Sequence, residues 1–199
     1  MRVIDVIFAF IAGKVVGFVV SDFLKEFGVA LTPSEAVILW LAFPLLAVFC
    51  LWLCFLIGRK ILAIYQLGKH LLVGAFATVV DLKVFEILIG FFSLFLFINP
   101  LIAKSASFIF STALKYWGNK YWVFEKSEKE NKKKEVAQFV TITLVGLIID
   151  VSIFYYATKW LGPQFGLSTA IWIKTSVILA AIAAAAWNFL GYKFLVFKK

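Results

Sequence analysis

Long apolar runs alternate with short polar or basic segments along this chain. The apolar runs cover residues 3–23, 36–57, 71–92, 101–123, 137–157 and 169–189. A helix of about 20 apolar residues crosses the hydrocarbon core of a bilayer. The pattern therefore predicts an all-α integral membrane protein with six transmembrane helices.

Local signals mark the ends of several of these helices. Thr32-Pro33-Ser34-Glu35 is typical of a helix start, and Asn99-Pro100 of a turn. We expect Pro44 to kink the second helix and residues 61–67 to form a short connector along the membrane interface. Lys14 interrupts the first run and no good cleavage site follows, which favours an uncleaved span over a signal peptide. The alternative is an amphipathic helix lying in the interface.

Composition and charge agree with a membrane protein. Apolar residues make up 63% of the 199 residues, and the mean hydropathy is +0.99, which is more than a soluble core can bury. The net charge of +9 comes mostly from lysines at or near helix ends, and only Arg2 and Arg59 are arginines. This arrangement predicts anionic membrane lipids as partners and disfavours nucleic acid. It also places both termini and the Lys-Glu segment 125–135 in the cytoplasm, with the protein in the inner (cytoplasmic) membrane of the cell.

The second half of the chain contains a degenerate internal repeat. Asp81 and Asp150, Lys104 and Lys174, and Phe124 and Phe197 lie in similar local sequences, separated by 69, 70 and 73 residues. Each unit holds two expected spans, so both units enter the membrane from the same side, as in parallel transporter repeats. We therefore expect two hairpins, in residues 68–126 and 135–199, that face each other.

Several short motifs in these hairpins resemble one family. They are His70-Leu-Leu-Val-Gly74, Thr78-Val-Val-Asp81, Ala103-Lys104, Asn119-Lys120-Tyr121-Trp122-Val123-Phe124, and Asn188-Phe189 with Lys193 and Val196-Phe197. Together they resemble the GtrA-like family of small four-helix membrane proteins. Lys115-Tyr116 and Tyr192 depart from the family's closing motif. The resemblance covers residues 68–199 and leaves residues 1–67 as a two-helix N-terminal extension.

The resemblance implies a role in cell-envelope polysaccharide pathways. Proteins of this family are thought to flip or shelter a polyprenyl-phosphate-linked sugar, or to assist the glycosyltransferases that make and use it. A lysine in an apolar groove can pair with the lipid phosphate, asparagine can bond sugar hydroxyls, and an aromatic ring can face the sugar. The candidate substrate-binding residues are therefore Asp81, Glu86, Lys104, Lys115, Trp117, Asn119, Lys120, Trp122, Asp150, Lys174, Asn188 and Lys193.

Helix depth suggests how the charged candidates pair. Asp81 lies about 16 Å from the basic end of its helix, and Lys115 about 10–13 Å from the same plane. We expect the pairs Asp81–Lys115 and Glu86–Lys104. In the second hairpin we expect Asp150 and Lys174 to take the corresponding places.

Purely structural interpretations of the same residues stay open. Lys104 and Lys174 could snorkel to the outer interface, and Lys120 and Lys193 could anchor the cytoplasmic one. Trp122 could belong to the interfacial aromatic belt. Asp81 and Asp150 are too short to snorkel from mid-helix, so their structural alternative is a bond between helices.

Three functions compete on this evidence. The leading one is a flippase or carrier for a lipid-linked monosaccharide. The second is a membrane platform that recruits a glycosyltransferase through the segment 125–135 and the first two spans. The third, a small multidrug-type cation exporter, is disfavoured because lysines at 104, 115 and 174 would repel a cation. No catalytic triad, metal cluster or nucleotide motif is present in the sequence, so we expect neither enzymatic activity nor a cofactor. A homodimer is possible for so small a bundle.

Overall fold

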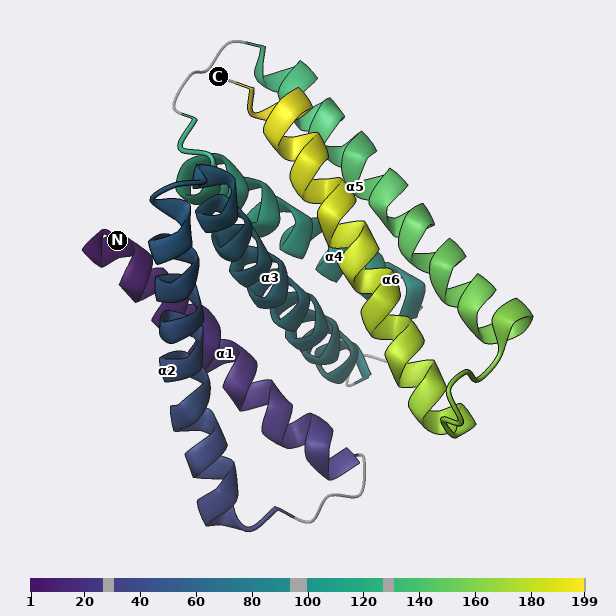
Figure 1. Cartoon of the computed structure of the whole chain (residues 1–199). Helices are drawn as coiled ribbons and strands as arrows, with labels where there is room; N and C mark the ends of the chain where they lie inside the picture. The colour runs from purple at the N-terminus through teal and green to yellow at the C-terminus, as the bar shows by residue number, and fades with distance from the viewer. Residues whose placement is uncertain (27–30, 94–99, 127–130, 199) are drawn as a thin grey trace. The chain divides into compact units, whose positions relative to one another are not determined.

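The computed structural model describes residues 1–26, 31–93, 100–126 and 131–198 (Figure 1). Within these segments the chain is helical, which confirms the all-α class. The α-helices are α1 (Val3–Glu26), α2 (Pro33–Gly58), α3 (Leu62–Ser93), α4 (Pro100–Trp117), α5 (Lys132–Tyr155) and α6 (Thr169–Gly191). Three π-helical segments extend α4, α5 and α6, namely η1 (Gly118–Val123), η2 (Tyr156–Leu161) and η3 (Tyr192–Val196).

Four described segments are long and apolar enough to cross a membrane, which supports a multi-pass membrane protein. They are Val3–Val20, Pro33–Gly58, Lys132–Leu161 and Thr175–Val196. The helices α3 and α4 are not among them. The charges of Asp81, Lys83 and Glu86 lie close together on α3, and α4 carries lysines and serines. Because these residues lower the hydropathy of α3 and α4, the six-span arrangement stays a prediction.

The chain divides into two compact units, Met1–Glu125 and Lys126–Lys199. In the first unit α1 packs on α2, both pack on α3, and α3 pairs with α4. In the second unit α5 and α6 form a hairpin. The extension and the first hairpin therefore share one compact unit, whereas the predicted boundary after residue 67 follows sequence resemblance and stays a prediction.

Glycines bring the first three helices into close contact. A Cβ on Gly13 of α1 would lie 2.6 Å from the Cα of Pro44 in α2. A Cβ on Gly68 of α3 would lie 2.9 Å from the Sγ of Cys54 in α2. Cys54 thus acts as a packing residue at this crossing. Small residues at such crossings allow two backbones to approach each other.

Helix boundaries agree with the local signals except at the start of α3. Thr32 caps α2 and forms a capping box with Glu35, which confirms the predicted start. In contrast, residues 62–67 belong to α3 and do not form a separate connector. Tyr65 is buried and Gly68 packs on Cys54, so this first part of α3 is held by the extension.

Candidate functional site

Asp81 is joined to the neighbouring helix α4 near the middle of the first hairpin. The carboxylate of Asp81 accepts a hydrogen bond of 2.7 Å from the hydroxyl of Ser107, which is fully buried. A charge-assisted bond of this kind lowers the cost of placing a carboxylate among apolar side chains. Ser107 was not among the sequence candidates, and the expected Asp81–Lys115 pair stays a prediction.

Glu86 has a partner on its own helix. Its carboxylate lies 2.8 Å from the Nζ of Lys83, three residues earlier on α3, and both side chains are partly exposed. The side chain of Lys104 lies outside the described part of the structure, so the expected Glu86–Lys104 pair is untested.

His70 and Asn119 link the start of α3 to η1. Nδ1 of His70 lies 2.7 Å from Oδ1 of Asn119, and both residues are buried. The amide nitrogen of Asn119 donates to the backbone carbonyl of Lys115 at 2.7 Å. Since the Asn119 oxygen is therefore the acceptor, His70 carries its proton on Nδ1. Both ends of the Asn119 amide are used within this hairpin.

The π-helical segment η1 turns several candidate side chains inward. Asn119, Lys120, Trp122 and Val123 are all buried. The Nζ of Lys120 donates to the hydroxyl of Tyr116 at 3.3 Å. Trp117, immediately before η1, is exposed. The candidates in and next to this segment thus differ, because the side chain of Lys120 is buried and that of Trp117 is exposed.

A buried ionic network, missed from the sequence, joins the extension to the hairpin. We name it the Asp5 cluster, and it comprises Arg2, Asp5, Tyr65, Lys69, Trp122 and Glu125. The side chains of Asp5 and Lys69 are 1% and 2% exposed, and they form an ion pair of 2.8 Å. Such a pair is stable only when further hydrogen bonds satisfy both groups.

The other members of the Asp5 cluster supply those hydrogen bonds. The hydroxyl of Tyr65 and the indole nitrogen of Trp122 each donate to the Asp5 carboxylate at 2.8 Å. Lys69 also donates to the carbonyl of Trp122 at 3.4 Å, and Arg2 bridges Asp5 to Glu125. Burial, and then the bond to Asp5, raise the pKa of Tyr65 above its ordinary value. Trp122, a predicted ligand contact, therefore holds the extension in place.

One sequence signal indicates that Asp5 needs a partner, although it does not identify the cluster. Asp5 stands near the start of an apolar run and Lys69 at the start of another. A carboxylate in such a place needs a cation, and Lys69 is one candidate at the same predicted membrane face, although it is distant in the sequence.

A groove of about 560 Å³ runs beside the cluster between α1, α3 and the end of α4. Its walls include Phe8 and Ile11 of α1, Phe76 of α3, and the aromatic residues Trp117, Tyr121 and Trp122, with Arg2 at its edge. An apolar groove with aromatic walls and one guanidinium suits an apolar chain that carries an anionic group.

The second hairpin holds the remaining candidates. Asp150 on α5 is half-buried. Asn188 on α6 is buried against Gly146, and its Oδ1 has no hydrogen-bond partner among the described residues. The Nζ of Lys193 lies 5.7 Å from the ring centre of Phe189 and 5.7 Å from that of Phe194. The side chain of Lys174 lies outside the described part of the structure.

Different side-chain contacts join α3 to η1 in the first hairpin and α5 to η3 in the second. In the second hairpin the ring of Tyr192 stacks on Phe139 at 4.5 Å, and its hydroxyl lies 2.6 Å from that of Thr143. An aromatic pair thus joins α5 to η3, whereas a histidine–asparagine bond joins α3 to η1.

Comparison with protein families gave a match over most of the chain. The family model described as the GtrA/DPMS transmembrane domain matches residues 69–197. Comparisons with curated proteins and with solved structures gave no match. The matched region begins at Lys69 and leaves α1 and α2 outside it.

Proposed function

Because the chain belongs to the GtrA/DPMS transmembrane domain family, we propose that it flips a polyprenyl-phosphate-linked monosaccharide across the cytoplasmic membrane. The family match indicates a role in handling polyprenyl-phosphate sugars. The finer proposal is that the protein shelters the sugar phosphate while the lipid chain stays in an apolar environment. It assigns binding and movement to this chain and no catalytic step.

The row of polar groups within the α3–α4 hairpin carries this proposal. Along one hairpin lie the His70–Asn119 bond, Lys115, and the Asp81–Ser107 bond. Polar groups inside a membrane are costly and usually serve function. A phosphate and a sugar head need such groups at successive depths, because each position must replace part of their hydration.

The groove beside α1 supports binding of the lipid chain. Trp117 and Trp122, both predicted ligand contacts, line it together with Phe8 and Phe76. An isoprenoid chain is branched and flexible, and aromatic and aliphatic walls suit it. Arg2 stands at the edge of the groove, where a phosphate could approach it.

The second hairpin supports binding of the sugar. The Oδ1 of Asn188 is buried and has no partner among the described residues, and a buried polar atom in this state calls for a ligand or a water. A sugar hydroxyl is a donor that would satisfy it.

We also propose that the two hairpins descend from one duplicated unit. A Cβ on Gly118 would lie 2.9 Å from Val73, and one on Gly191 would lie 2.6 Å from Ile142. Val73 and Ile142 are 69 residues apart, and Gly118 and Gly191 are 73 apart, as in the sequence repeat. Each hairpin thus closes on a glycine packed against a β-branched residue.

Scrambling of a fluorescent polyprenyl-phosphate sugar in proteoliposomes tests the proposed transport. We expect rapid loss of leaflet asymmetry with the purified wild-type protein. Asp81→Asn and Lys115→Gln should slow it about tenfold or more, because each removes a partly buried charge from the hairpin. Thr141→Val, at an exposed position of α5, is the matched control and should leave the rate unchanged.

If the protein is a membrane platform, we expect a different result in the same experiment. A protein that only recruits a glycosyltransferase would give no scrambling above protein-free liposomes, and it would co-purify with the transferase through segment 125–135. Wild-type protein without scrambling activity would therefore overturn the transport proposal and favour the platform.

A further inference from the structure

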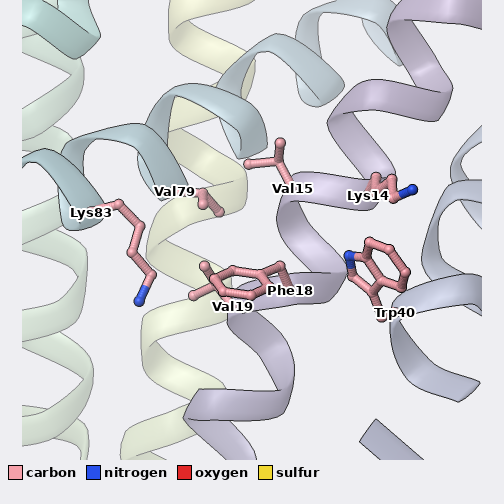
Figure 2. Close-up of a pocket in the computed structure, with 7 residues that line it drawn as sticks. All are labelled: Lys14, Val15, Phe18, Val19, Trp40, Val79 and Lys83. Atoms are coloured by element: carbon pink, nitrogen blue, oxygen red, sulfur yellow. The ribbon is translucent and has the colours of Figure 1, made fainter. Parts of the chain in front are cut away.

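A second pocket lies further along α1, where the extension meets α3. It has a volume of about 260 Å³ and is lined by Val15, Phe18 and Val19 of α1 and Val79 of α3, with Lys14, Trp40 and Lys83 (Figure 2). Five of these seven residues belong to the extension, outside the matched family region. The pocket is thus a feature that the extension adds to the domain.

Two cations border this otherwise apolar pocket. Figure 2 shows Lys83 on one side and Lys14 with Trp40 on the other, with Phe18 and Val19 between them. The Nζ of Lys14 lies 4.0 Å from the centre of the Trp40 ring, and the Nζ of Lys83 lies 5.8 Å from that of Phe18. Aromatic faces stabilise a cation only partly.

Neither lysine stands at a helix end. Lys14 is about 16 Å along α1 from Val3, and Lys83 is about 15 Å along α3 from Ser93. A lysine at a helix end reaches water or headgroups by snorkelling. Lys14 instead lies over an indole ring of α2. A cation held in this way, in the middle of an apolar helix, points to an anionic ligand at the same depth.

We propose that this pocket binds the phosphate group of an anionic lipid between Lys14 and Lys83. Figure 2 shows the Nζ of Lys14 pointing away from Lys83, so a change of side-chain rotamer must bring the two ammonium groups to one phosphate, and the four-carbon stem of each lysine allows it. The indole nitrogen of Trp40, which Figure 2 places on the ring edge toward Phe18, donates a further hydrogen bond. Val15, Val19 and Val79 contact the first carbons of the lipid chain.

Glu86 is the competitor for this phosphate. Its carboxylate lies 2.8 Å from the Nζ of Lys83 and is half-exposed. An arriving phosphate must share Lys83 with this carboxylate, since both anions need the same ammonium. Removal of the Glu86 charge should therefore strengthen binding of the lipid phosphate. A purely structural role of these lysines would not predict this increase.

Native mass spectrometry of the full-length protein in detergent tests the inference. The probes are a polyprenyl phosphate, phosphatidylglycerol, and zwitterionic phosphatidylcholine. We expect Lys14→Gln and Lys83→Gln each to weaken binding of the anionic lipids about tenfold, and Glu86→Gln to strengthen it. Lys14→Arg should retain binding. Lys60→Gln, an exposed lysine at the end of α2, is the matched control.

The outcomes separate the sources of the phosphate. Preference for polyprenyl phosphate supports a site for the carrier lipid, and equal binding of both anionic lipids supports a general phospholipid site. Equal binding by wild type, Lys14→Gln, Lys83→Gln and Lys60→Gln overturns the inference, as does equal binding of phosphatidylcholine. If Lys14→Gln does not fold, Lys83→Gln and Glu86→Gln decide the question.

This inference stands apart from the proposed transport. It requires a bound lipid phosphate and no movement of it. Scrambling that survives in Lys14→Gln, but fails in Asp81→Asn, would separate the two sites.

Discussion

Asp5 is the residue on which the attachment of the extension depends. Its carboxylate takes hydrogen bonds from Tyr65, Trp122 and the backbone of Arg2, besides the ion pair with Lys69. Asp5 itself lies on α1 and its partners include residues of α3 and η1, so one side chain joins three segments. We therefore expect single substitutions here to act on stability.

Asp5→Leu should destabilise the protein by about 3–5 kcal/mol, because Lys69 is left buried without its counter-charge. The double variant Asp5→Leu with Lys69→Met should recover most of that loss, since neither partner then carries an unpaired charge. Thermal unfolding in detergent measures both changes. Lys133→Gln, at an exposed position, serves as the control. A double variant as unstable as the single one would contradict this reading of the pair.

The His70–Asn119 bond allows a second test at single residues. His70→Phe leaves the buried oxygen of Asn119 without its donor and should cost about 1–3 kcal/mol. Adding Asn119→Tyr copies the Phe139–Tyr192 stack of the second hairpin and should restore part of the loss. A double-mutant cycle in thermal unfolding measures the coupling, and purely additive effects would show that the two positions do not act as a pair.

At the scale of the helices, close crossings explain where glycine is required. The Cβ of an alanine at position 13 would meet the backbone of Pro44 and Phe43, whereas one at position 74 would meet open space. Gly13→Ala should destabilise the protein by about 1–3 kcal/mol through overpacking. Gly74→Ala, the same change in α3, should stabilise it by about 0.5–1 kcal/mol through helix propensity. Equal unfolding temperatures for the two variants would refute this account.

Local sequence patterns predicted the helices well. The capping box at Thr32 and Glu35 and the start of α4 at Pro100 follow from turn and capping residues. The early start of α3 could not be seen in this way. It depends on contacts of Tyr65 and Gly68 with distant residues of α1 and α2, and periodicity carries no information about such partners.

The candidate site was predictable only where a residue's local sequence indicates that it needs a partner. Asp81 was singled out because a short carboxylate in mid-helix needs a partner on another helix, and Ser107 provides one. The Asp5 cluster was missed because Asp5 and Lys69 look like ordinary helix-end charges when each is read alone. Their pairing depends on how α1 lies against α3, which the order of residues does not reveal.

At the scale of the whole molecule, the distribution of lysines predicts the orientation in the membrane. Arg2 pairs with Glu125 in the first unit, and Lys126 donates to the carbonyl of Lys198 in the second. Arg2 and Lys198 thus each contact one of the first two residues of the Lys-rich segment 125–135, each within its own unit. We propose that this segment and both termini face the cytoplasm.

Cysteine labelling of intact cells tests this orientation. With Cys50 and Cys54 replaced by alanine, Lys133→Cys and Lys198→Cys should react with an impermeant maleimide only after the membrane is opened. Phe165→Cys, whose native side chain is 95% exposed in the turn before α6, should react in intact cells. Labelling of Lys133→Cys from outside would reverse the orientation.

The Asp5–Lys69 ion pair also constrains how the protein is made. The carboxylate of Asp5 lies on the first helix and its cation on the third, so the ion pair can form only after α3 has been synthesised. Trp122, which completes the network, arrives later still. We therefore expect α1 to reach its final packing only after α3 and η1 have been synthesised.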